Sequence, residues 1–316
     1  MTPTAAVRHD RERDRLSHLP PELRVFDESI RGGLGVGAPG KVGVLELDLV
    51  AAGGVTRVHR QYQQAPLHVF RPIHLDPGRP DMAFIFIQQS GDGYVQGDRC
   101  RVGVTCTPGA AAHVTTQAPT KVFAARHNVA TQLVNFDVAA NAVLEYLPDP
   151  VIPCRDSRFF QRIEVVADES STVILGETLL PGRVAYGERH VCELYWSETE
   201  VRRPDGTLLF ADVFRLSPGD GAHPASIGLC GGHDVVASLY VVTSRVEPPG
   251  LVAVVGGALA VCPDVVVGVS ELPNHCGVVA RVLGHSSKTV QAAVTNAWSE
   301  VRLTLLGAPA PNLRKG

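Results

Sequence analysis

The chain has 316 residues, of which 45% are apolar and 19% are charged. This composition excludes wholesale disorder, and the length allows one large domain or two of ordinary size. Basic residues number 29 and acidic residues 32, so the formal net charge is -3 and no general positive field exists to hold a phosphate backbone. We therefore expect no nucleic-acid partner.

The N-terminal residues 1–38 carry a mixed charge run and end in a glycine-rich stretch with few apolar side chains. We expect a mobile arm here, followed by a single domain over residues 39–316. Within the arm, residues 20–26 begin with two prolines and favour one or two helical turns. The glycine string at 32–37 is not preceded by a strand, so it does not indicate a dinucleotide site.

From residue 41 onward, apolar and polar residues alternate with the period of a half-buried strand. Short runs rich in Val, Thr, Phe and Leu recur at roughly ten-residue spacing, with Gly, Pro or polar turns between them. The expected strands lie at residues 42–48, 56–60, 82–88, 99–106, 111–116, 131–138, 162–166, 172–175, 190–199 and 208–216. An all-β architecture follows for residues 40–220.

The last third of the chain differs, because residues 222–239 and 286–306 carry apolar residues at helical spacing. We expect one or two helices there that pack on the sheets. The apolar runs at 251–262 and 264–269 fit either the core or a partner surface. The longest apolar stretch, 250–262, is shorter than the roughly 18 residues that cross a bilayer, so we expect no membrane partner.

The cysteines are dispersed without a Cys-x-x-Cys pair, and the first residues lack the apolar core of a secretory signal. We expect a cytoplasmic protein whose cysteines are reduced and pack as small apolar side chains. The chain also lacks the Gly-x-Ser-x-Gly, His-Glu-x-x-His and phosphate-loop patterns of common enzymes. We therefore expect no catalytic activity and no tightly bound cofactor.

Two segments in the first half place acids, hydroxyls and glycines between strands. Residues 90–99 form a turn with two acids and three glycines, a pattern that also fits a solvated hairpin turn. Residues 115–123 are typical of a strand that stops at Pro119 and presents Thr120 and Lys121.

Two further segments follow in the middle of the chain. Residues 144–153 contain three prolines, which favour an extended edge or a turn over a regular sheet interior. Residues 175–188 set three charged groups beside flexible, glycine-containing backbone.

Together and in this order, the four segments resemble the urease accessory protein family UreD, called UreH in some bacteria, from about residue 40 to residue 220. The resemblance rests on the glycine-rich turn, a TTQ strand, an LE-aromatic-LP segment and an acid six residues before a Gly-Arg pair. Gln96 stands where most family members have glycine. The matching residues include Gly91, Gly97, Asp98, Thr120, Lys121, Glu145, Glu177, Arg183, Gly187 and Glu188.

The resemblance implies a mainly β fold, with an elongated, distorted β-helix-like body of many short strands and about two helices in the C-terminal third. It implies a non-catalytic chaperone of urease maturation that binds apo-urease on one side and UreF, with the GTPase UreG, on the other. It also implies an internal water-filled passage along which nickel moves, bound only transiently.

Nickel in such a passage stays solvated or weakly ligated, so scattered carboxylates and hydroxyls suit its walls better than a closed cage. The candidates for the nickel route are Asp98, Thr120, Glu145 and Glu177. Each has a structural alternative, since Asp98 can cap a turn, Thr120 can bond backbone groups, and the glutamates can pair with Arg126 or Arg183. We expect Asp98→Ala to lower urease activation while leaving folding intact.

Two other functions stay open at this point. A β-structured binding module would hold urease in an activation-competent shape without passing metal. An unrecognised β-helical hydrolase, with Asp and Glu as acid and base, would turn over a substrate as an isolated chain.

Overall fold

The computed structural model describes residues 20–26, 40–221, 223–224 and 226–313. The expected mobile arm over residues 1–38 lies outside the described residues except for 20–26. These form the predicted helical turns, as the 3-10 helix η3 (Pro21–Phe26). Leu23 of η3 is fully buried against Phe160, Leu194 and Trp196, so this segment packs on the body of the protein.

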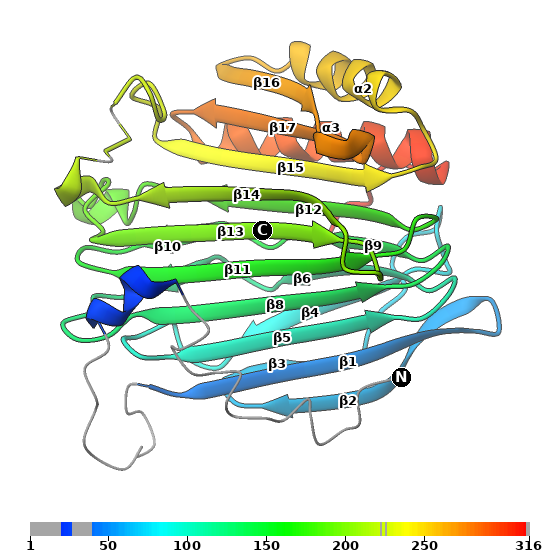
Figure 1. Cartoon of the computed structure of the whole chain (residues 1–316), viewed down its shortest axis with the longest axis horizontal. Coiled ribbons are helices and arrows are strands. Elements are labelled where there is room, and N and C mark those ends of the chain that lie inside the picture. Colours follow the sequence, from blue (N-terminus) through cyan, green and yellow to red (C-terminus); the bar gives the residue numbers. More distant parts are fainter. Residues whose placement is uncertain (1–19, 27–39, 222, 225, 314–316) are drawn as a thin grey trace.

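Two sheets make up that body (Figure 1). The strands of the seven-stranded sheet are β1 (Val42–Ala52), β2 (Val55–Gln64), β5 (Arg99–Cys106), β8 (Ala130–Val138), β11 (Arg158–Ala167), β13 (Leu194–Arg202) and β14 (Leu208–Leu216). Their order across the sheet is β14-β13-β11-β8-β5-β1-β2.

The strands of the ten-stranded sheet are β3 (Leu67–Val69), β4 (Ala83–Gln89), β6 (Ala111–Thr116), β7 (Thr120–Val122), β9 (Val143–Tyr146), β10 (Val151–Pro153), β12 (Thr172–Leu179), β15 (Val235–Thr243), β16 (Val265–Glu271) and β17 (Gly277–Gly284). Their path is β16-β17-β15-β12-β9-β6-β4-β3, with β7 and β10 paired beside it. All the expected strands are present.

The chain passes back and forth between the two sheets from β4 to β13, adding a strand to each in turn. As a result β5, β8, β11 and β13 are parallel neighbours in one sheet, and β4, β6, β9 and β12 in the other. This is a β-solenoid-like coil of about four turns, flanked on both sides by antiparallel strands. It confirms the mainly β, β-helix-like body.

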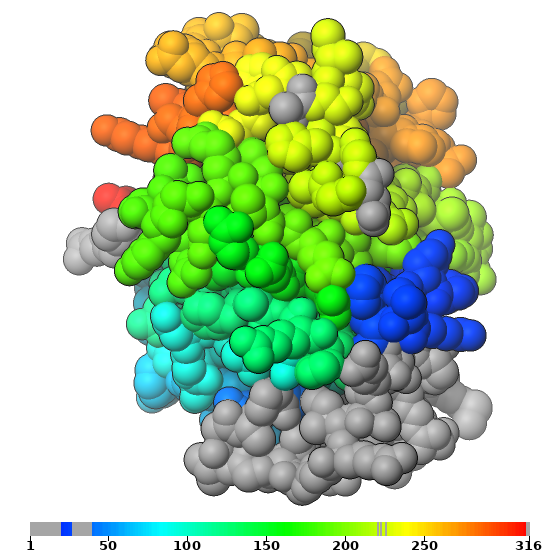
Figure 2. Space-filling model, turned by 90° about the vertical axis from the view of Figure 1, so that its left-hand side faces the viewer, coloured from blue at the N-terminus to red at the C-terminus, as the bar shows by residue number. Residues whose placement is uncertain are grey.

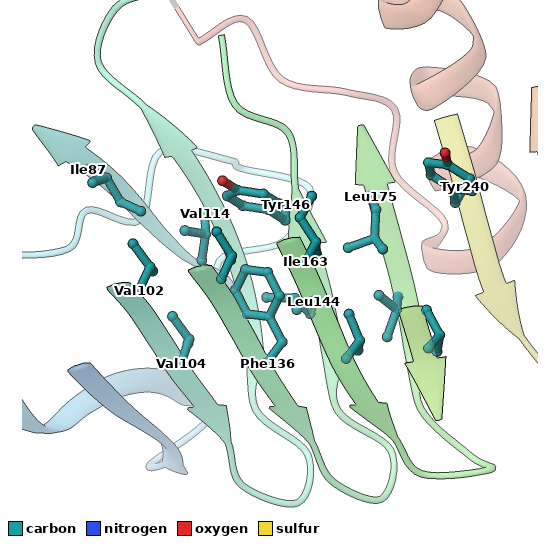
Figure 3. Packing of buried hydrophobic residues seen from close by; sticks show 14 of the residues in the cluster. Ile87, Val102, Val104, Val114, Phe136, Leu144, Tyr146, Ile163, Leu175 and Tyr240 are labelled. Atoms are coloured by element: carbon teal, nitrogen blue, oxygen red, sulfur yellow. The ribbon is translucent and has the colours of Figure 1, made fainter. Parts of the chain in front are cut away.

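The main core lies between the two sheets (Figure 3). Alternate residues of each strand point inward, so Val102, Phe136 and Ile163 of one sheet face Leu144 and Leu175 of the other. These side chains are almost fully buried, and each such burial contributes about 1.5–3 kcal/mol relative to an exposed position.

Two helices cover the outer face of the ten-stranded sheet (Figure 1): α2 (Pro248–Ala260) and α3 (Ser287–Leu306). The prediction of a helix at residues 286–306 is confirmed, and Val290, Ala293 and Val301 form its buried stripe. Short 3-10 turns complete the structure: η4 (Val184–Tyr186), η5 (Pro218–Asp220) and η6 (Pro273–His275).

The prediction of a helix at residues 222–239 is wrong. The described part of this segment is a loop that leads into β15, and all nine residues of β15 are buried. A strand covered on both faces shows a continuous apolar run, which matches helical spacing as readily as a strand pattern. The helix instead forms in the apolar run 251–262, whereas residues 265–271 form the largely exposed edge strand β16.

The seven cysteines are free thiols, and all except Cys262 are buried, as expected. In the part of the chain that the structure describes, no helix combines the length and apolar character needed to span a bilayer.

Candidate functional site

The four family-like segments lie together at one end of the solenoid. Each connects the C-terminal end of a strand in the ten-stranded sheet to the N-terminal end of the next strand in the seven-stranded sheet. Because these connections stack turn upon turn, segments far apart in sequence become neighbours. We call this the connection end; it lies on the left in Figure 1 and faces the viewer in Figure 2.

A cavity of about 490 Å³ opens at the connection end, and we call it the mouth cavity. Its walls come from the first two segments, including Gly91, Thr120 and Lys121, together with Gln132 of β8. The Lys121 ammonium group donates to an Asp92 carboxylate oxygen at 2.7 Å across the opening. Thr120 and Lys121 belong to the short strand β7, and the Thr120 amide donates to the Pro150 carbonyl oxygen at 2.9 Å.

Glu177 lies deeper, between the two sheets. It shares the inward face of β12 with Val173, Leu175 and Leu179, which belong to the main core. Its carboxylate accepts hydrogen bonds from the Gln161 amide at 2.7 Å and from the Ser197 hydroxyl. Burial raises the pKa of Glu177 above its ordinary value.

A smaller cavity, which we call the interior cavity, contacts Glu177 and has room for about one water molecule. Thr116, Thr120 and Gln132 line both this cavity and the mouth cavity. A polar lining therefore runs from the opening at the connection end to the Glu177 carboxylate. The structure thus brings together Gly91, Lys121, Thr120 and Glu177 of the predicted residues.

Sequence reasoning missed the polar residues that surround Glu177 or line the interior cavity with it. Gln132, Gln161, Ser197 and Thr199 occupy inward positions of β8, β11 and β13, where neighbouring inward residues are apolar. The sequence did contain a sign of these residues, because Gln132 and Gln161 are polar residues at strand positions whose neighbours two residues away are apolar. Burying an amide or hydroxyl is costly unless it is hydrogen-bonded, so such a position indicates a buried polar site.

Glu145 lies on the opposite face of the ten-stranded sheet, away from the interior cavity. Its carboxylate contacts the His113 ring at 2.7 Å and the Arg302 Nε at 3.2 Å, and all three side chains are fully buried. Arg302 also donates to Asp76 at 2.5 Å. The prediction that Glu145 pairs with Arg126 or Arg183 is wrong; it belongs to a buried ionic network beneath α3, and Trp298 of α3 covers His113.

Asp98 is almost completely buried beneath the glycine-rich turn. Its two carboxylate oxygens accept the backbone amides of Lys41 and Val95, each at 3.0 Å. Burial is the main cause that raises the pKa of Asp98. Asp98 contacts neither cavity, so the geometry favours the turn-capping alternative, and its part in nickel transfer stays a prediction.

The turn above Asp98 depends on its glycines. Gly91 and Gly97 adopt positive φ angles of 107° and 76°, which other residues rarely adopt. Sequence reasoning did not single out Gly93, where an added Cβ would lie 2.3 Å from the Lys121 carbonyl oxygen. The turn therefore packs its backbone directly on β7.

The fourth segment is held by an ion pair. Arg183 donates to both carboxylate oxygens of Glu188, at 2.8 and 2.5 Å, and its guanidinium holds the pKa of Glu188 below the ordinary value. Gly187 ends η4 with a φ of 72°. The suggested pairing of Glu177 with Arg183 is therefore wrong, because Arg183 pairs with Glu188 and fixes the loop that leads into β13.

Within the described residues, no three or more His, Cys, Asp or Glu side chains are arranged to hold a metal ion. Around Glu177 the donors are one carboxylate, amides and hydroxyls. Such oxygen donors suit weak, exchangeable binding of a divalent cation.

The fold and the site define a β-solenoid-like protein with a polar path from one end to a buried carboxylate. The family model described as UreD urease accessory protein matches residues 41–316. The chain is 42% identical to urease accessory protein UreD 2 of Streptomyces griseus, over 91% of this chain and 98% of that protein. It is 38% identical to UreD of Haloarcula marismortui, over 89% of this chain and 92% of that protein.

A third relative, UreD of Cenarchaeum symbiosum, is 31% identical over 90% of this chain and 99% of that protein. The match covers nearly the whole described structure, including both sheets and both C-terminal helices. The chain belongs to the UreD family of urease accessory proteins.

Proposed function

We propose that this protein is a non-catalytic scaffold of urease maturation that binds apo-urease, UreF and UreG and conducts nickel toward the urease active site. Nickel is its transient cargo, and the chain needs no resident cofactor. The observation that carries the proposal is the polar lining from the mouth cavity to Glu177 inside an otherwise apolar core.

The size of the interior cavity determines how a nickel ion would travel. The cavity has room for about one water molecule, so a fully hydrated cation does not fit without exchanging part of its shell. The Glu177 carboxylate and the side-chain amide oxygen of Gln161 are suitable replacements, because both residues line this cavity and neither belongs to a closed cage. Binding is therefore weak enough for release.

Burial and a bound cation act on the Glu177 carboxyl in opposite directions. Burial raises its pKa, whereas a nearby dication favours the ionised carboxylate. Nickel at this position would therefore oppose the effect of burial on the pKa of Glu177.

The same small cavity favours a second function, in which the protein only holds urease in an activation-competent shape. In that case the polar residues near Glu177 stabilise the fold and no metal passes. The two functions differ in whether a change at Glu177 that preserves complex formation stops nickel delivery.

The proposed role in maturation is tested by co-expressing the organism's own urease and accessory proteins with and without this chain. We expect both urease activity and nickel per purified active site to collapse without it, and the chain to co-purify with urease and UreF. Unchanged activity and nickel content would contradict the proposal. Substrate turnover by the isolated chain would instead support the hydrolase alternative.

A further inference from the structure

A passage needs a second opening, and the end opposite to the connection end does not provide one. There the inward residues are apolar and almost fully buried, as at Cys106, Val138, Ala167 and Val173. At these positions the side chains offer a cation no oxygen ligand, so its desolvation would be uncompensated there. A cation that reaches Glu177 must leave by another route.

The side of the body where β14 faces β15 and β17 is also unfavourable. Arg281 of β17 donates hydrogen bonds to Ser238 and Asp212 there, and the Tyr240 hydroxyl also donates to Asp212. These four side chains are joined by hydrogen bonds at the gap between the sheets. The guanidinium is a fixed positive charge, and it repels an approaching dication.

The pairing between strands of the ten-stranded sheet is interrupted beside the interior cavity. Strand β9 ends at Tyr146, and β10 pairs with β12 only through Val151 and Leu179. Between them, Pro148 and Pro150 have no amide to donate, so no regular ladder crosses this stretch. Threonine side chains of β6 hold it instead: Thr115 donates to the Leu147 carbonyl oxygen at 2.5 Å.

Residues 147–150 and Thr178 form a wall beside the interior cavity. A groove of about 480 Å³ lies on the other side of this wall, between residues 147–150 and helix α3. Pro148, Asp149 and Thr178 line both the groove and the interior cavity. Glu177 and Thr178 are consecutive residues of β12, so strand alternation places them on opposite faces of the sheet. One peptide unit therefore separates the inner cavity from the outer groove.

We propose that this gap in the ten-stranded sheet is the second opening of the passage, with Asp149 as the carboxylate that receives the cation from Glu177. The inference rests on the proposed function. Asp149 is partly buried and is positioned by two hydrogen bonds with Thr116. The Thr116 hydroxyl donates to the Asp149 carboxylate at 2.9 Å and accepts a hydrogen bond from the Asp149 backbone amide at 2.8 Å. Thr116 lines the mouth and interior cavities, and its partner Asp149 lines the interior cavity and the groove.

The test compares four single variants in the complete co-expression system, with nickel per purified urease active site as the readout. Thr178→Phe fills the wall, and Asp149→Asn removes the charge at constant size. Thr120→Phe blocks the mouth. Gln291→Phe adds the same ring at an exposed position of α3 that lines the groove but not the interior cavity, and is the matched control.

We expect Thr120→Phe, Thr178→Phe and Asp149→Asn each to lower nickel content by roughly tenfold, as loss of a group near a metal commonly does. Gln291→Phe should leave it unchanged. Co-purification with urease and the circular dichroism spectrum show whether each variant is folded. If Thr178→Phe does not fold, Asp149→Asn decides the question alone.

The possible failures are distinguishable. If Thr120→Phe stops nickel delivery while Asp149→Asn and Thr178→Phe do not, the passage stands and the lateral opening is wrong. If none of the three has an effect, nickel conduction itself is wrong. If Gln291→Phe is as harmful as Thr178→Phe, the groove is a partner-binding surface and not an opening.

Discussion

Glu177 lies in a strand whose other inward side chains are apolar, and this contrast determines its chemistry. The Gln161 amide and the Ser197 hydroxyl satisfy its carboxylate, while burial disfavours its charge. Asp98 shows the opposite use of a buried acid, because its oxygens are already occupied by two backbone amides. Of these two acids, Glu177 lines the interior cavity, whereas Asp98 lines neither cavity.

The raised pKa of Glu177 predicts a pH dependence of stability. A raised pKa means that the folded state binds the proton more tightly than the unfolded chain, whose value is about 4.3. The free energy of unfolding therefore falls as pH rises through that value toward the folded one. We expect Glu177→Gln to gain stability relative to the parent as pH rises above the unfolded-state value, measured by urea unfolding.

The exposed Glu164, on the outward face of β11, supplies the control for this measurement. Glu164→Gln makes the same chemical change at an exposed position and measures the effect of the substitution without burial. A pH-independent difference between Glu177→Gln and the parent would show that burial does not perturb the Glu177 carboxyl.

Asp98→Ala should destabilise the protein, in contrast to the expectation from sequence that folding stays intact. The change leaves the amides of Lys41 and Val95 without their charged acceptor, at a cost of roughly 1–3 kcal/mol. Urea unfolding measures this cost. If urease activation falls with Asp98→Ala and recovers at lower growth temperature, the loss is one of stability; normal stability with failed activation would restore Asp98 to the nickel route.

At the scale of elements, the strands were predictable because their alternation survives wherever one face meets a polar environment. The helix boundaries were less so. Residues 235–243 are buried on both faces and lose the alternation, and α2 contains no charged residue that would mark a solvent-facing side. The sequence also did not predict which face of the sheet Glu145 occupies. Both faces of the ten-stranded sheet are covered, and the alternation of residues along a strand does not show which face points toward the other sheet.

The glycine-rich turn predicts a difference between two neighbouring glycines. Both have positive φ, but an added Cβ at Gly93 meets the backbone of Lys121, whereas at Gly91 it meets nothing within 4 Å. We expect Gly93→Ala to lower the free energy of unfolding by roughly 3 kcal/mol or more, and Gly91→Ala by about 1 kcal/mol. Thermal unfolding compares the two, and equal losses would contradict the packing of this turn on β7.

The buried ionic network predicts that Arg302 fastens α3 to the sheet. Arg302→Met leaves the carboxylates of Asp76 and Glu145 buried without their shared cation, which costs about 3–5 kcal/mol. Arg245→Met is the matched control, because Arg245 is exposed and, among the described residues, its guanidinium donates to the carbonyl oxygen of Leu305 at the long distance of 3.5 Å. Urea unfolding should show a loss below about 1 kcal/mol for this control; similar losses for both would mean that the network does not anchor the helix.

At the scale of the whole molecule, the solenoid gathers the family-like segments at one end, and the inward residues at the opposite end are apolar. The sequence motifs predicted which segments matter, because each carries turn glycines, prolines or acids that a regular strand does not need. They did not predict that Glu177 faces inward while Glu145 faces α3, because that depends on how the two sheets stack. The polar path is thus a property of the assembled coil and not of any one motif.

The most direct test of nickel conduction is the nickel content of urease matured with Glu177→Gln in place of the parent chain. Glu164→Gln serves as the matched control, and co-purification with urease and UreF confirms that both variants assemble. We predict that Glu177→Gln lowers nickel per active site by roughly tenfold while assembly is unchanged, and that the control does not. Full nickel loading with Glu177→Gln would contradict the passage and leave a scaffold that passes no metal through this carboxylate.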